Sequence, residues 1–285
     1  VLEVENGVTI KLKDGVIYGP LLQNKSAVEL VRQSTASITA GSTTLTDATI
    51  TTADIGRSVI VRNAGHGGTE AIPTLLCAVI VSASTGQATL SAAASLTVSG
   101  AVSTYYNRDT DITVIGGLWD FNNGNNPGSP NADGYYNSSH MTKFRRVDGL
   151  MLKGMTFKSN AGKYGINLAD VTDYKVINPT FDTFSDGCHI SGPAYRGVIS
   201  GLRGKTGDDY IGVTARDYKY YADTQGDVIG LNLLDIAPDN TSSGRLLLAG
   251  GPGHMVDDVR VDGVRGTGRG VFLGSGLDDP NCEPM

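Results

Sequence analysis

The chain has 285 residues, of which 40% are hydrophobic and 18% charged, so it can bury at least one sizeable core. Asp and Glu (29) outnumber Lys and Arg (23), the net charge is −6 and no basic run occurs, so nucleic acid is not the expected partner. No run of 18 apolar residues occurs, which argues against membrane insertion through a helix.

The first third of the chain contains two different kinds of strand pattern. Residues 1–33 alternate short apolar runs with the turn pairs Asn6-Gly7 and Asp14-Gly15, which predicts the first strands of the main fold. Residues 34–102 are rich in Thr, Ser and Ala with alternating apolar positions, which predicts an inserted antiparallel β subdomain with one polar face. The three cysteines are far apart and are predicted to be free thiols.

Residues 103–285 contain a repeat in which aliphatic residues are followed by Gly or Asn. The repeated segments are VIGGLW, LKGMTF, VINPTF, ISGLRG, IGLNLL and VDGVRG, which begin at Val114, Leu152, Val176, Ile199, Ile229 and Val261. Their spacings are 38, 24, 23, 30 and 32 residues. A period in the low twenties, lengthened by inserted loops, is typical of a coil built from three short strands.

Each unit carries a second apolar element about a dozen residues later. These elements begin at Tyr164, Asp186, Asp208, Gly244 and Arg269. One coil cannot bury its own apolar side, whereas stacked coils form a continuous core. The sequence therefore predicts an all-β fold, a right-handed parallel β-helix with an inserted antiparallel β subdomain.

A candidate site follows from the spacing of three aspartates. Asp186 and Asp208 are 22 residues apart, close to one coil, so their carboxylates are expected on neighbouring rungs of one face, beside Asp209. Arg245 is expected near the column of Asp209. Carboxylates this close raise the pKa of at least one of them, which supplies the acid and the base that glycosidic hydrolysis needs. The alternative is that these Asp and Gly residues only form turns.

At these residues the chain resembles a known superfamily. FSDGCHISG followed by GKTGDDYIGV resembles the paired motifs of polygalacturonases within the pectate-lyase-like β-helix superfamily, and DITVIGGLWDFNNG resembles the strand and turn that open its central coils. The Thr- and Ser-rich insertion is similar to insertions of bacteriophage tailspike and tail-fibre depolymerases. The resemblance implies that Asp186, Asp208 and Asp209 hydrolyse glycosidic bonds with inversion. The Gly-His-Gly and Arg-Ile-Lys elements of polygalacturonases are absent here.

Other side chains are candidates for binding the substrate. His189, Arg216, Arg245 and His254 are predicted to contact the glycan, with hydrogen-bonded structural histidines and a surface ion pair as the alternatives. Aromatic residues around Trp119, Tyr135 and Tyr136, and around Tyr218, Tyr220 and Tyr221, could stack on sugar rings or pack over the loops.

Three functions remain open from the sequence. The first is a polysaccharide-binding glycoside hydrolase without a cofactor, carried on a virion tail or secreted, and a homotrimer if it is a tailspike. The second is a non-catalytic β-helical receptor-binding or structural module of a virion, in which the aspartates would be capped by amides or paired with Arg. The third is a polysaccharide lyase, for which the aspartates could bind calcium.

Overall fold

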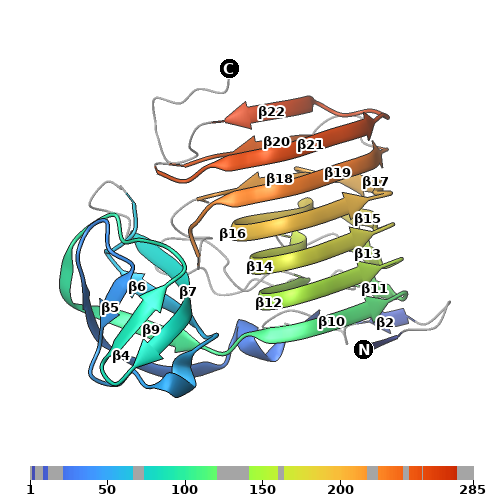
Figure 1. The fold of residues 1–285 in the computed structure, drawn as a ribbon. Helices are drawn as coiled ribbons and strands as arrows, with labels where there is room; N and C mark the ends of the chain where they lie inside the picture. The colour runs from blue at the N-terminus through green and yellow to red at the C-terminus, as the bar shows by residue number, and fades with distance from the viewer. Residues whose placement is uncertain are drawn as a thin grey trace.

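The computed structural model describes residues 2–3, 9–11, 22–66, 74–120, 141–159, 164–216, 224–239, 244–251 and 253–274. These residues form a stack of parallel coils with a closed antiparallel barrel at its side (Figure 1). The predicted fold class, a right-handed parallel β-helix with an inserted antiparallel β subdomain, is confirmed. Within the described residues, no helix has the length and apolarity needed to cross a membrane.

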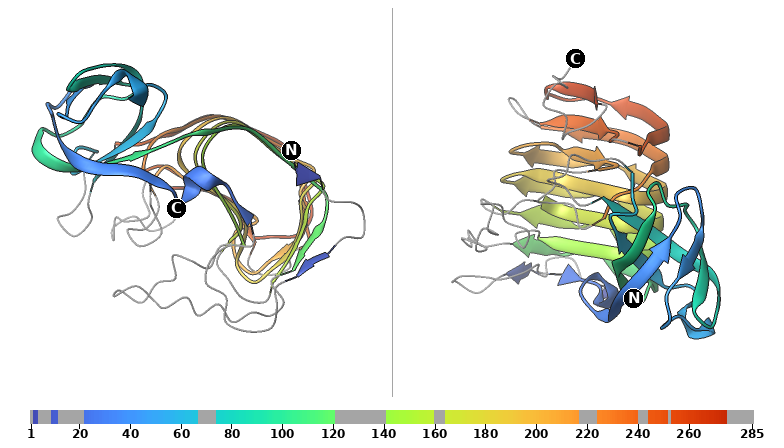
Figure 2. Two further views of the ribbon diagram at one scale, coloured as in Figure 1. Left: turned by 90° about the horizontal axis from the view of Figure 1, so that it is seen from below. Right: turned by 90° about the vertical axis from the view of Figure 1, so that its left-hand side faces the viewer.

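The stack contains parallel strands that superimpose when viewed along its axis (Figure 2). Its strands are β1 (Leu2–Glu3), β2 (Thr9–Lys11), β3 (Leu22–Gln23), β10 (Asp109–Ile115), β11 (Leu118–Asp120), β12 (Thr142–Lys153), β13 (Thr156–Lys158), β14 (Tyr164–Ile177), β15 (Thr180–Thr183), β16 (Asp186–Ser200), β17 (Arg203–Thr206), β18 (Ile211–Thr214), β19 (Val228–Pro238), β20 (Arg245–Ala249), β21 (Val256–Val264) and β22 (Gly270–Gly274).

Each coil has three strand segments. In β16 the first two segments form one long strand, whose first half pairs with β18 and whose second half pairs with β19. A turn then leads to the short third segment, such as β15 or β17. Strands β1, β2 and β3 pair with β10, β11 and β12, so the residues before the barrel already contribute to the stack.

The strand register tests the repeat residue by residue. Val114, Leu152, Val176 and Ile199 pair in succession, as the repeat predicts. The next partner of Ile199 is Leu233, which in turn pairs with Val261. The segment beginning at Ile229 was therefore aligned wrongly, four residues too early.

The cause of that error is the turn that follows each aligned residue. One residue there has a positive φ, a backbone conformation that Gly and Asn adopt most readily. The members of this column are Gly116 (φ 77°), Gly154 (63°), Asn178 (50°), Gly201 (69°), Asp235 (53°) and Gly263 (73°). Asp235 stands where the repeat expects Gly or Asn. The repeat was therefore aligned on Gly230, which also has a positive φ but lies at a different bend of the coil.

The inward side chains of successive coils form one continuous core. Phe157 and Phe181 stack with their ring centroids 5.5 Å apart, on neighbouring rungs of the third segment. Trp119 belongs to this core and is 1% exposed, with its Nε1 donating to the carbonyl of Gly116. Of the two alternatives for Trp119, stacking on a sugar ring is excluded, because the neighbouring coils bury the side chain. The tyrosines at 135, 136, 218, 220 and 221 lie outside the described residues.

The inserted subdomain is a closed barrel with its own core. Its strands, in the order β4-β5-β8-β7-β6-β9, are β4 (Leu30–Ile38), β5 (Thr44–Thr46), β6 (Ser58–Arg62), β7 (Leu75–Ser84), β8 (Gln87–Leu90) and β9 (Val98–Tyr106). The 3-10 helix η1 (Lys25–Ala27) precedes the barrel, and η2 (Thr52–Asp54) lies within it. Closure depends on the pairing of β4 with β9, which leaves neither strand with a free edge. Cys77 in β7 and Cys188 in β16 are free and buried, whereas Cys282 lies outside the described residues.

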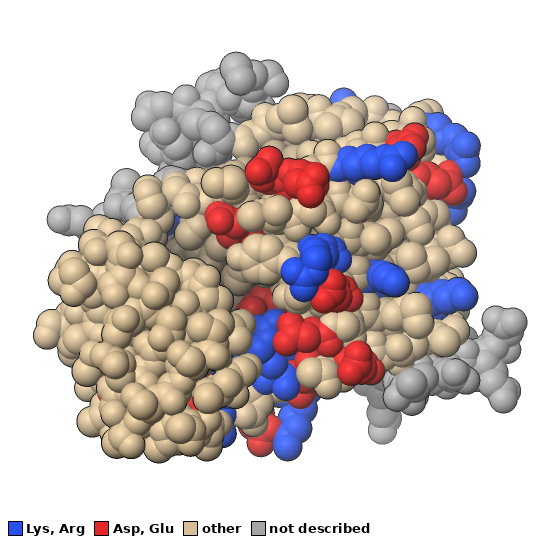
Figure 3. Space-filling model, in the orientation of Figure 1, with Lys and Arg blue, Asp and Glu red and all other residues tan. Residues whose placement is uncertain are grey.

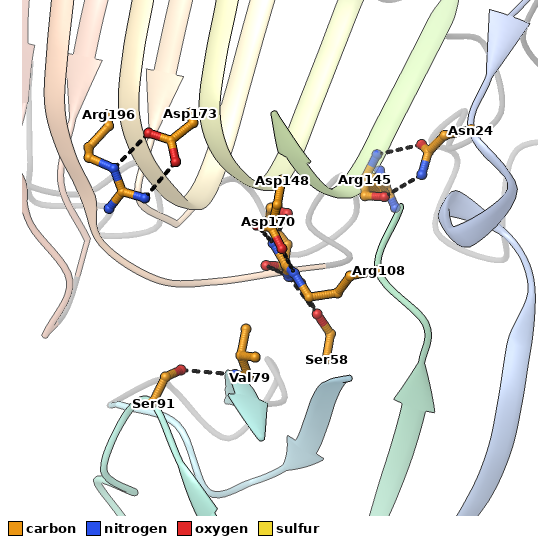
Figure 4. Close-up of polar contacts among 10 residues, drawn as sticks. All are labelled: Asn24, Ser58, Val79, Ser91, Arg108, Arg145, Asp148, Asp170, Asp173 and Arg196. Carbon is orange, nitrogen blue, oxygen red and sulfur yellow. Dashed lines mark hydrogen bonds and ion pairs between the residues drawn. The ribbon is translucent and has the colours of Figure 1, made fainter. Parts of the chain in front are cut away.

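The barrel is fixed to the stack by a charged network. Arg108 donates to Asp148 (2.7 Å) and Asp170 (2.6 Å) of the coils and to the hydroxyl of Ser58 in the barrel (2.7 Å) (Figure 4). Figure 3 shows charged side chains of both signs gathered where the barrel meets the coils, whereas the barrel face beside them carries few charges. Because Arg108 and Asp170 are buried, losing one partner would leave a charge without compensation.

Candidate functional site

The site lies where the chain enters the first strand segment of two neighbouring coils. Asp186 is the first residue of β16, and Asp209 precedes β18. Cys188 pairs with Ile211, and the amide of Gly187 donates to the carbonyl of Asp209 (2.9 Å). Asp209 therefore occupies the rung position next to Asp186. The sequence prediction placed Asp208 there, and it was wrong by one residue because the coil has 23 residues rather than 22.

The structure nevertheless brings the three predicted carboxyl groups together. One oxygen from each of Asp186, Asp208 and Asp209 lies within 4.8 Å of the other two. Asp186 and Asp209 are each 3% exposed, whereas Asp208 is only partly buried. We call these three residues the acid cluster.

Asp209 has the electrostatic environment of a proton donor. Burial, and then the charge of Asp186, raise the pKa of Asp209 to about 7. The guanidinium of Arg245 opposes this rise, because its Nε donates to Oδ1 of Asp209. Near neutral pH the cluster can thus hold a protonated carboxyl beside an ionised one, the combination that acid–base catalysis requires.

His189 is held against the acid cluster by contacts on both ring nitrogens. Its Nδ1 lies 2.9 Å from Oδ2 of Asp186, and its Nε2 lies 3.2 Å from the hydroxyl of Thr214. The ring also stacks on Tyr164, with the centroids 4.1 Å apart. With the proton on Nδ1, His189 donates to Asp186 and accepts from Thr214, which fixes the orientation of the Asp186 carboxyl group.

A glycine makes this arrangement possible. Gly212 stands next to His189 on the following rung. A β-carbon there would lie 2.8 Å from Nδ1 of His189 and 3.3 Å from Oδ2 of Asp186. Any larger residue at position 212 would therefore displace the contact between His189 and Asp186.

The remaining predicted binding residues lie in different surroundings. Arg245 contacts the cluster through Asp209, and its side chain is 29% exposed. Arg216 is buried after β18, beside the backbone of Gly251. His254 lies on the barrel side of the stack, 3.6 Å from the carboxylate of Asp227, with its ring centroid 6.4 Å from that of His66. The described contacts therefore join His189 and Arg245 to the cluster, whereas the described contacts of His254 are with Asp227 and His66. For all four of these residues, contact with a glycan stays a prediction.

Sequence reasoning missed three residues of this site. Tyr164 pairs with Asp186 and Thr214 pairs with Ser191 on the neighbouring coils, so both are out of register with His189 and the coil period alone does not identify them. Phe184, two residues before Asp186, was also missed, because a single aromatic residue in a turn carries no pattern. Its side chain is largely exposed.

The acid cluster also has the donor atoms of a metal site. Three carboxylates offer the hard oxygen ligands that calcium prefers, although calcium takes six to eight oxygens in total. Arg245 already donates to Asp209 and would place its positive charge next to a bound cation. This arrangement fits proton transfer better than cation binding.

Comparison with known proteins gives matches to solved structures only. No protein-family model and no curated protein matches the chain. The tailspike protein gp49 from Pseudomonas phage LKA1 matches with a TM-score of 0.43 and 12% identity, over 90% of this chain and 45% of that one. The tailspike gp61 of Pseudomonas phage phi297 matches with a TM-score of 0.40 and 14% identity, over 91% of this chain and 47% of that one.

A third match is the Gp54 tailspike of Acinetobacter baumannii bacteriophage AP22, in complex with A. baumannii capsular saccharide. It has a TM-score of 0.30 and 10% identity, over 87% of this chain and 57% of that one. The chain thus spans about half the length of these tailspikes. At these scores the likeness assigns no activity to this chain.

Proposed function

We propose that this chain binds a bacterial surface polysaccharide and hydrolyses its glycosidic bonds at the acid cluster. The observation that carries the proposal is the carboxyl of Asp209, whose pKa is raised to about 7 within 4.8 Å of two further carboxyl groups. A phage tailspike or a secreted depolymerase is the setting in which we expect this activity.

The three carboxyl groups take different parts in the reaction. Asp209 gives its proton to the glycosidic oxygen as the bond from that oxygen to the anomeric carbon breaks. Asp208, the least buried of the three, accepts a proton from the water that attacks the anomeric carbon. Asp186 lies against His189, and its charge contributes to the raised pKa of Asp209.

A second function has its own support. Asp209 is paired with Arg245, and Asp186 and Asp209 are both buried, as expected if the aspartates only maintain the fold of a glycan-binding module. In that case the chain binds the polysaccharide without cleaving it.

The decisive experiment incubates the protein with a panel of bacterial capsular and cell-wall polysaccharides. Reducing ends report hydrolysis, the ultraviolet absorbance of unsaturated sugars reports a lyase, and sedimentation with the insoluble glycans reports binding. We expect reducing ends without unsaturated products. Retention of a glycan without any cleavage would establish the binding module instead, and failure to retain any glycan would refute both functions.

Two variants locate the activity. Asp209→Asn keeps the shape of the side chain but removes its proton, so cleavage should fall by ~10²–10⁴-fold while binding persists. Asp182→Asn is the matched control, because Asp182 lies on the same coil as Asp186 but is 53% exposed and paired with Lys205. This control should cleave as fast as the unmodified protein.

A further inference from the structure

Phe184 is an exposed aromatic side chain beside the acid cluster. It lies in the turn between β15 and β16, and it is 63% exposed. Among the Phe, Tyr and Trp side chains that the structure describes, it alone is largely exposed. A single exposed apolar residue is common on protein surfaces, so its position has to carry the argument.

The backbone around Phe184 is fixed from both neighbouring coils. On one side its amide donates to the hydroxyl of Ser159 (3.5 Å). On the other side the amide of Gly207 donates to the carbonyl of Thr183 (2.9 Å). These bonds therefore fix the backbone from which the Phe184 ring extends on the surface.

Gly207 also keeps that surface uncovered. Thr183 pairs with Thr206, so Gly207 is the equivalent of Phe184 one coil further on. A β-carbon at Gly207 would lie 1.8 Å from the carbonyl oxygen of Phe184, which excludes every other residue. No side chain from this position can cover the ring.

Phe184 is close enough along the backbone for one sugar unit to reach both its ring and the acid cluster. Phe184 and Asp186 are two residues apart, so their α-carbons are separated by at most ~7 Å. A pyranose ring has an apolar face of C–H groups, which an aromatic ring covers with loss of water from both surfaces. A sugar lying on Phe184 would present its glycosidic bond to the cluster.

We propose that Phe184 is the stacking platform for a pyranose unit next to the bond that is cleaved, an inference that depends on the proposed function.

The test uses the polysaccharide that the unmodified protein retains most strongly from the capsular and cell-wall panel. Phe184→Ala should weaken its binding about tenfold, whereas Phe184→Trp should preserve it. Because the ring is exposed, neither variant should change the midpoint of thermal unfolding. Ile55→Ala, at a 51% exposed barrel residue, is the control and should bind normally.

Phe184→Trp also gives a direct optical signal. The one natural tryptophan, Trp119, is buried in the core, so emission from exposed indole reports position 184. Addition of the glycan should shift this emission to shorter wavelength and protect it from iodide quenching.

Two results would overturn the inference. They are unchanged binding by Phe184→Ala and no spectral change in Phe184→Trp. Either of these with glycan binding intact leaves the proposed function standing. Failure of the unmodified protein to bind any glycan would end both.

Discussion

Replacing Asp209 by Asn should make the protein more stable at alkaline pH. In the folded chain the carboxyl of Asp209 ionises with a pKa of about 7, against an ordinary value of 3.8. Ionisation of Asp209 is therefore less favourable in the folded state than in the unfolded chain. Above pH 8 this costs the wild-type fold up to ~4 kcal/mol, a large part of the ~5–15 kcal/mol that typically stabilises a domain.

The sign of the pH dependence follows from proton binding. Between about pH 4 and pH 7 the folded state keeps a proton on Asp209 that the unfolded state has lost. The free energy of unfolding of the wild type should then fall, relative to Asp209→Asn, by ~1.4 kcal/mol per pH unit across this window. Below pH 4 both states are protonated, and the difference between the two proteins should disappear.

Urea unfolding of the two proteins at intervals from pH 4.5 to pH 8.5, followed by circular dichroism, measures this difference. Asp182→Asn is again the control and should follow the wild type. If Asp209→Asn is no more stable than the wild type at pH 8, or if the same gain appears at pH 4.5, Asp209 does not hold a proton in the folded protein.

Three further predictions concern the surroundings of the site and the two cores. Arg245→Met removes the cation that favours ionised Asp209, so the alkaline limb of the rate of cleavage should move to higher pH in a pH–rate profile. Arg108→Met should lower the free energy of unfolding, measured with urea, by ~3–5 kcal/mol, because it leaves a buried carboxylate without its cation. Arg196→Gln, in an exposed pair, should lower it by less than ~1 kcal/mol. Leu168→Ala should lower the free energy of unfolding by ~2–5 kcal/mol, because it leaves a cavity between coils. Leu273→Ala, at a 68% exposed residue, should lower it by less than ~0.5 kcal/mol.

The coil repeat could be predicted because its physical cause is local. Each coil needs a residue with positive φ after the same inward aliphatic residue, and Gly and Asn mark that place in the sequence. The prediction failed where Asp235 adopts the same conformation without the usual residue type. Asp tolerates this region when its short polar side chain is accommodated, so composition alone does not reveal the turn.

The barrel and the site depended on information that is not local. The Thr- and Ser-rich pattern predicted an antiparallel insertion, but closure depends on pairs such as Leu30 with Tyr106, far apart in the chain. The spacing predicted that the aspartates lie together, with an error of one residue in the register of the neighbouring coils. Spacing also placed Arg245 near the column of Asp209, and the structure shows Arg245 donating to Asp209 from one residue off that column.

The most direct test of the site is the titration of Asp209 itself. Carboxyl carbons of aspartate, labelled with ¹³C, are followed by NMR in the wild type and in Asp209→Asn, and the resonance missing from the variant belongs to Asp209. The account predicts that this resonance titrates with a midpoint near pH 7. A midpoint below pH 4 would contradict it, because Asp209 would then be ionised at neutral pH and could not donate a proton to a glycosidic oxygen.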